Sequence, residues 1–307
     1  MRIFVSNANE SWIVDRFRDE WYEHNNSIST DRILLSDIVW IIAPWNFKKI
    51  NIPKIKNKKV VCTVHHIDEK SFLEKERKNF MILDKYVDEY HTISKNSYKQ
   101  LKKLTNKRIN VIPFWVDSNK WFPIEGKSNL RNKYELTEND YLIGSFQRDT
   151  EGKDLKSPKL IKGPDIFLEL IKTQFLKREN LKIILTGKRR NYLINEFKKN
   201  NIEYKYFEMV NTETLNELYN ILNLYIVSSR IEGGPQAILE CSSAKIPLIS
   251  TNVGIAPEIL SKKSIIDLRN DFTAEPDIEF QYNKVLKYFI PDGMAPFIQM
   301  FRGLYES

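Results

Sequence analysis

Short apolar runs alternate with longer amphipathic stretches along most of this chain. That alternation is typical of βα repeats built around a parallel sheet. We expect buried strands at residues 2–6, 37–43, 59–65, 89–94, 109–114, 141–146, 181–187, 204–209, 224–229 and 246–251. The pattern therefore predicts an α/β protein with parallel sheets.

Helical periodicity fills several of the intervals between these strands. We expect helices at residues 11–24, 74–87, 163–175, 190–200, 212–222 and 234–244. Turn-forming residues cluster between 117 and 140 and predict a linker there. The chain should therefore form two Rossmann-like domains, residues 1–125 and 126–285, followed by a helical tail over residues 286–307.

Glycine is distributed unevenly along the chain. All ten glycines lie at Gly126 or later, so the first 125 residues contain none. A G-x-G-x-x-G turn therefore cannot follow the first strand, which argues against a nicotinamide or flavin dinucleotide site there. No Walker-type loop occurs either. Phosphate binding is expected in the second half.

Composition and charge are typical of a folded protein and argue against a membrane-spanning segment. Hydrophobic residues make up 42% of the chain, enough for a well-buried core, and no apolar run is long enough to span a bilayer. Cys62 and Cys241 lie in apolar surroundings and predict buried free thiols in a reducing cytoplasm. We expect no signal peptide. The net charge of +8 predicts a lysine-rich surface, with attraction to an anionic membrane, a phosphorylated substrate or nucleic acid as alternatives.

Two glutamates, Glu232 and Glu240, flank a glycine pair after the predicted strand that ends at residue 229. Gly233 and Gly234 let the backbone approach a ligand closely, and Pro235 suits the first turn of a helix. The helix start attracts an anion, and a carboxylate two turns in can bind a ribose diol. The alternative is that Glu232 complements the helix dipole and that Glu240 is a surface residue.

The segment SRIEGGPQAILE resembles the E-x7-E signature of retaining GT-B glycosyltransferases, in particular those of family 4. The resemblance continues through residues 60–68, 108–123, 143–149, 161–171, 214–230 and 244–260, in the family's order. It implies a GT-B fold, in which two Rossmann-like domains turn their parallel sheets toward a central cleft. It also implies an acceptor-side first domain, a nucleotide-sugar-binding second domain, and a final helix that crosses back to the first.

The resemblance assigns roles to particular residues of the second half. Arg148 and Lys162 would hold the donor diphosphate together with the backbone of Gly233, Gly234 and Pro235. Glu240 would bind the ribose, and Glu232 would bind the transferred sugar. We therefore expect Glu232, Arg148 and Lys162 to take part in catalysis.

A histidine near the transferred sugar is also implied by the resemblance. His65 ends a predicted first-domain strand and matches that position, with His66 beside it as the alternative. A lone histidine at a strand end also serves as a structural hydrogen-bond donor. His24 and His91 match nothing in the family and are expected to be structural or exposed.

The chain departs from the family pattern between Arg148 and Lys162, where an insertion replaces the usual short turn. The insertion carries Lys153, Lys156 and Lys159, any of which is an alternative to Lys162 as a phosphate ligand. A solvated, mobile surface segment is the other interpretation.

The first domain departs from the family as well. The loop after its first strand lacks glycine and offers Ser6, Asn7 and Asn9 as donors. Phe114 and Trp115 replace the usual Asn-Gly at the hinge, and we expect them to pack on a particular partner.

The sequence thus predicts a metal-independent, retaining glycosyltransferase without a cofactor. Its donor would be a UDP-, GDP- or ADP-linked sugar and its acceptor a glycan or a lipid-linked molecule. We expect it in the cytoplasm, with peripheral contact at the inner membrane face as an option, and we expect no nucleic-acid partner. The alternatives are a sugar-nucleotide epimerase or a phosphorylase of the same fold, and a basic binding module without catalysis.

Overall fold

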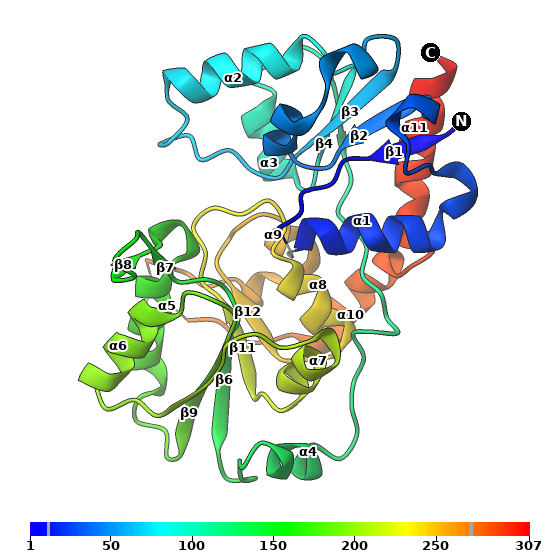
Figure 1. Cartoon of the computed structure of the whole chain (residues 1–307). Coiled ribbons are helices and arrows are strands. Elements are labelled where there is room, and N and C mark those ends of the chain that lie inside the picture. Colours follow the sequence, from blue (N-terminus) through cyan, green and yellow to red (C-terminus); the bar gives the residue numbers. More distant parts are fainter. Residues whose placement is uncertain (11–12, 270–272) are drawn as a thin grey trace. The chain divides into compact units, whose positions relative to one another are not determined.

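The computed structural model describes residues 1–10, 13–269 and 273–307 and divides the chain into two compact units (Figure 1). Unit 1 comprises Met1–Phe114 and Pro291–Ser307, and unit 2 comprises Trp115–Ile290. The C-terminal helix therefore belongs to the same unit as the N-terminal residues. The first two residues of the predicted helix 11–24 lie outside the described part of the chain.

The sheet of unit 1 is parallel and has the order β1-β2-β3-β4-β5. Its strands are β1 (Ile3–Val5), β2 (Ile38–Ile41), β3 (Lys59–Val64), β4 (Glu89–Thr92) and β5 (Arg108–Val111). On the free side of β1, Ile3 forms a parallel bridge with Ser29. The chain thus passes from β1 to the bridge at Ser29 on one side and then to β2 on the other, so it changes direction across the sheet between β1 and β2, while the five strands follow in sequence order.

Helices of unit 1 cover both faces of this sheet. Along β2, Trp40 contacts Trp21 of α1 (Ile13–His24) and Phe301 of α11 (Ala295–Glu306). The neighbouring Val39 and Ile41 instead pack in a cluster with Phe80 and Leu83 of α2 (Glu74–Asp84). The alternation follows from the two-residue period of a strand that is buried on both faces.

The sheet of unit 2 is also parallel, with the order β10-β9-β6-β11-β12. Its strands are β6 (Tyr141–Ser145), β9 (Leu181–Thr186), β10 (Tyr204–Phe207), β11 (Leu224–Val227) and β12 (Leu248–Ser250). The first three strands run outward from β6, and the chain then crosses back to place β11 on its other side. The strand order therefore reverses between β6 and β11.

Helices also lie on both faces of the second sheet. A buried cluster joins Ile183 and Ile226 to α5 (Pro164–Leu170) and α6 (Asn191–Lys199). Tyr225 points to the opposite face and meets Tyr219 of α7 (Thr212–Asn220). The remaining elements are α4 (Lys127–Lys133), α8 (Gln236–Ser243), α9 (Ala256–Ile259), α10 (Ile278–Val285) and a hairpin of β7 (Thr150–Glu151) and β8 (Ser157–Pro158).

The α/β class and all ten predicted strands are confirmed, but several details differ. The predicted helical tail over residues 286–307 divides at Pro291, because residues 286–290 belong to unit 2 and α11 belongs to unit 1. The predicted linker contains α4, and α3 (Lys95–Leu101), which lacks a strong apolar period, was not predicted. Both cysteines are buried and free. Within the described residues, no helix is long and apolar enough to cross a membrane.

Candidate functional site

Three segments meet where the strand order of unit 2 reverses: the loop after β6, the turn before α5 and the end of β11. Gly163 makes this approach possible, because its φ is +61° and a Cβ there would lie 1.9 Å from the carbonyl oxygen of Ser228. The Gln147 side-chain amide donates to the Lys162 carbonyl at 2.8 Å and to Ser228 Oγ at 3.1 Å. Lys162 is thereby held at the carboxyl end of the sheet, where open α/β folds bind ligands.

Glu232 and Lys162 are brought together at this edge. Lys162 Nζ donates a hydrogen bond to Glu232 Oε1, and the Ser229 hydroxyl donates to the same oxygen at 3.3 Å. Both side chains remain partly accessible, at 21% for Lys162 and 13% for Glu232. The pair is therefore within reach of a ligand and is not sealed in the core.

Arg148 follows β6 and lies on the same edge. Its Nε donates to the Thr150 carbonyl at 2.9 Å, which orients the guanidinium. Burial, together with the positive charges of Arg148 and Lys162, lowers the pKa of Lys159. Lys159 thus lies within electrostatic range of Arg148, Lys162 and Glu232, and a cluster of such cations can neutralise a diphosphate.

The inserted segment between Arg148 and Lys162 forms the β7–β8 hairpin. Lys153 and Lys156 are exposed in it, whereas Lys159 is half-buried at its base, where its backbone N–H donates to the Asp149 carbonyl at 2.7 Å. Of the three inserted lysines, Lys159 is therefore the one placed with Arg148 and Lys162.

A buried ion pair that the sequence did not reveal supports the loop after β6, which carries Arg148. Arg190 Nε lies 2.7 Å from Asp149 Oδ2, and the two side chains are 0% and 2% exposed. Thr150 Oγ1 accepts from the Tyr192 backbone N–H at 2.8 Å. These bonds join the loop after β6 to the start of α6, and so they fix the backbone that carries Arg148. The only sequence signal was an arginine pair after the strand that ends at Thr186.

The Gly233–Pro235 backbone lies just before α8, which begins at Gln236, two residues later than predicted. Gly254, with φ +51°, lets the next turn approach, because a Cβ there would lie 2.5 Å from the Gly233 carbonyl oxygen. The Gln236 side chain donates to the Trp115 carbonyl at 2.8 Å. Trp115 of the unusual hinge therefore anchors the start of this helix.

Glu240 lies in α8 and is only 4% exposed, so the surface alternative is wrong. Its Oε2 accepts a hydrogen bond from the Tyr219 hydroxyl at 2.8 Å. Burial and the nearby carboxylate raise the pKa of Tyr219 well above its usual value, which keeps that hydroxyl a donor. The structure thus holds the second glutamate of the motif in one orientation.

His65 belongs to unit 1, at the end of β3. Its Nε2 lies 2.9 Å from the carbonyl oxygen of Ile42, so this nitrogen carries the proton. The ring lies 5.7 Å from that of Trp45 and is stacked on Phe114 at 5.9 Å, measured between centroids. His66 is partly exposed beside it.

His91 is structural. It is completely buried, with Nδ1 2.9 Å from the Thr63 hydroxyl and Nε2 2.7 Å from the Ile112 carbonyl oxygen. Burial lowers its pKa to about 3, so the ring is neutral at physiological pH. This agrees with the expectation that His91 lies outside the site.

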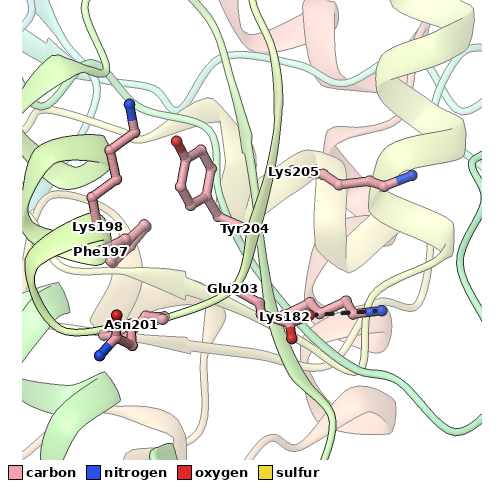
Figure 2. A pocket seen from close by; sticks show the side chains of 8 residues that line it. Lys182, Phe197, Lys198, Asn201, Glu203, Tyr204 and Lys205 are labelled. Atoms are coloured by element: carbon pink, nitrogen blue, oxygen red, sulfur yellow. Dashed lines mark ion pairs between the residues drawn. The ribbon is translucent and has the colours of Figure 1, made fainter.

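A pocket of about 500 Å³ lies at the other end of the second sheet, at the amino ends of β9 and β10 (Figure 2). Lys182 pairs loosely with Glu203 there, at 3.9 Å, and Lys198 and Tyr204 line the same hollow. None of the predicted donor residues lines it. Among the described residues, no cluster of three His, Cys, Asp or Glu side chains has the geometry of a metal site.

Residues 130–284 match the family model of glycosyl transferases group 1. This is half of the chain, and it includes every predicted donor residue of unit 2. The chain belongs to this family. It is a glycosyltransferase of the GT-B fold class, as the resemblance implied. No curated protein matches it.

Solved structures of similar fold match nearly all of this chain. HepE of Anabaena in complex with UDP-glucose superposes with a TM-score of 0.75 at 12% identity, covering 100% of this chain and 99% of HepE. Sucrose-phosphate synthase of Thermosynechococcus elongatus gives 0.70 at 12% identity, covering 95% and 77%. A glycosyltransferase of Rickettsia africae gives 0.63 at 17% identity, covering 98% and 84%.

Proposed function

We propose that the protein is a retaining, metal-independent glycosyltransferase that uses a nucleotide-diphosphate sugar as its donor. The observation that carries this proposal is the Lys162–Glu232 pair, set beside Arg148 at the strand-order reversal of unit 2. This combination offers cations for a diphosphate and a carboxylate for sugar hydroxyls at one place. The complex of HepE with UDP-glucose supports a uridine donor as the first to test.

The ion pair suggests how the donor enters the site. Lys162 is paired with Glu232. A diphosphate would bind the ammonium group of Lys162 together with Arg148 and Lys159. Glu232, released from Lys162, would then bind the hydroxyls of the sugar. Glu240, held by Tyr219, would accept hydrogen bonds from the ribose.

Transfer would proceed on one face of the sugar. The bond between the anomeric carbon and the diphosphate oxygen breaks while the acceptor oxygen forms its bond to the same carbon. The acceptor proton passes to the departing phosphate oxygen, so no separate enzymatic base is required. The cation cluster stabilises the charge that develops on the leaving diphosphate. His65 would contact the transferred sugar.

The experiment follows donor breakdown by NMR in a buffer with a metal chelator, using UDP-glucose, GDP-mannose and ADP-glucose in separate samples. We expect one donor to lose its sugar, by transfer or by slow hydrolysis, with the first-formed sugar in the donor's anomeric configuration. The opposite configuration would overturn the retaining mechanism, and restored activity only with a divalent cation would overturn metal independence.

Two other outcomes would replace the proposal. Inversion at C2 of an intact nucleotide sugar would indicate an epimerase. Binding of nucleic acid or anionic vesicles that falls steeply with salt, without any response to nucleotide sugars, would indicate a basic binding module.

A further inference from the structure

The chain changes direction across the sheet of unit 1 between β1 and β2, and the loops after these strands are tied to each other. Ser6 Oγ accepts from the Ile42 backbone N–H at 3.1 Å, and Lys49 Nζ donates to the Ala8 carbonyl at 2.6 Å. Ligands of open α/β sheets bind at the carboxyl ends of the strands where the chain changes direction across the sheet. Unit 1 therefore has a ligand position of its own.

Trp45 stands out at this position because it is exposed. It is 46% accessible, whereas the four other tryptophans that the structure describes are each at most 1% accessible. Trp45 belongs to the short helical segment Pro44–Lys49, which is fixed at its far end by the Lys49 bond to Ala8. The indole is therefore presented to solvent from a rigid support, beside His65.

We propose that the indole of Trp45 is a stacking platform for a saccharide ring of the acceptor, which makes the acceptor a glycan or a glycosylated molecule. This rests on the proposed function, since it assigns the receiving side of the same reaction. A sugar ring has an apolar C–H face, which covers an aromatic ring, and hydroxyls at its rim, which need polar partners.

The surroundings of Trp45 favour a saccharide over a lipid chain. The neighbouring loop after β1 carries the exposed residues Asn7, Asn9 and Glu10, which are polar. Their backbone is held, because the N–H groups of Asn9 and Glu10 both donate to the Asp15 carboxylate. An exposed ring with fixed polar neighbours suits a sugar ring, whereas an acyl chain would need a continuous apolar surface.

Fluorine NMR of the protein labelled with 5-fluorotryptophan tests the platform without any assay of transfer. Trp45→Phe assigns the resonance of Trp45. We expect methyl glycosides or disaccharides such as maltose, cellobiose and lactose to shift that resonance saturably and to leave the buried tryptophans unmoved. The proposal is overturned if no saccharide shifts it, or if only adenosine or octanol does.

Substitutions of Trp45 test whether the stacking platform contributes to sugar transfer. Trp45→Ala should lower kcat/KM for the acceptor about tenfold relative to donor hydrolysis, and Trp45→Phe should restore most of it. Tyr305→Ala is the matched control, because Tyr305 is a 47% exposed aromatic residue of the same unit. An unchanged ratio in Trp45→Ala would refute the role. If the wild-type protein neither binds nor consumes any donor, the proposed function fails, and the fluorine NMR result still decides for or against the platform.

Discussion

The loops at the β6–β11 reversal of unit 2 and those after β1 and β2 of unit 1 occupy equivalent places in two parallel sheets, yet their chemistry differs. The first place is charged: Lys162 pairs with Glu232, and Lys159 lies within electrostatic range of this pair and of Arg148. The second is marked by an exposed aromatic ring, with Trp45 against His65. A diphosphate needs the first kind of site and a sugar ring suits the second.

The same contrast appears in the backbone. Unit 2 brings its loops together through glycine, since a Cβ at Gly163 or Gly254 would overlap a carbonyl group. Residues 1–114 of unit 1, which contain its whole sheet, have no glycine, and this unit ties its loops through side chains such as Ser6 and Lys49. The two sites are therefore expected to respond differently to substitution.

The largest effect is expected from removing the charges of unit 2. Glu232→Ala and Arg148→Ala should each lower transfer by about 10³-fold or more, because each removes a charged contact made in the transition state. Circular dichroism and melting should show both variants folded. The exposed Glu213 serves as a control, and Glu213→Ala should transfer normally. Near-normal turnover in both site variants would refute the assignment.

Glycine substitutions compare the backbones of the two units directly. Gly163→Ala should cost about 3 kcal/mol of unfolding free energy, because it combines a left-handed φ with a clash against the Ser228 carbonyl. Gly303→Ala in α11 meets nothing within 4 Å and should instead stabilise by about 0.5–1 kcal/mol. Denaturant titration measures both. Equal effects would show that the close approach at Gly163 does not constrain the fold.

Acid should weaken unit 1 through His91. Its pKa is about 3 in the folded protein, below the unfolded value of about 6.5, so the unfolded chain binds more protons between these values. The contribution of His91 to the free energy of unfolding is thus fully present above pH 6.5 and is lost as the pH falls toward 3.

The expected loss from His91 is about 2 kcal/mol between pH 7 and pH 5. Hydrogen exchange of β4 should therefore accelerate over this range more than that of β9 in unit 2, after correction for the intrinsic rate. The difference should shrink in His91→Gln. If the difference in exchange between β4 and β9 persists unchanged in that variant, titratable groups other than His91 cause it.

The smallest effect concerns the inserted hairpin. Lys159→Ala should raise the donor KM about fivefold, because Lys159 is half-buried with Arg148 and Lys162. Lys153→Ala, at an exposed position of the same hairpin, should leave KM unchanged. Equal KM values for the two variants would mean that the hairpin contributes no specific phosphate ligand.

The strands and the motif loop were predictable because their signals are local. Apolar runs specify buried strands, and a glycine pair between two acids specifies a ligand loop at a strand end. The roles of Glu232, Arg148, Lys162 and His65 stay predictions. The structure adds that the first three lie on one sheet edge, which spacing alone did not require.

The missed features depend on contacts that are distant in sequence. The Asp149–Arg190 pair joins residues 41 positions apart, and no periodicity reveals it. The platform at Trp45 was missed because a tryptophan after an apolar strand looks like core, and only the fold leaves it exposed. The break at Pro291 within the predicted tail was missed because helical periodicity continues on both sides of it.

Calorimetric titration of UDP-, GDP- and ADP-sugars into the chelator-treated protein tests the central claim most directly, namely that the charged edge of unit 2 holds the donor diphosphate. The account predicts that at least one of them binds the wild-type protein, that Arg148→Ala weakens this binding at least about tenfold, and that Lys153→Ala does not change it. Equal affinity in all three proteins, or no binding to the wild type, would contradict it.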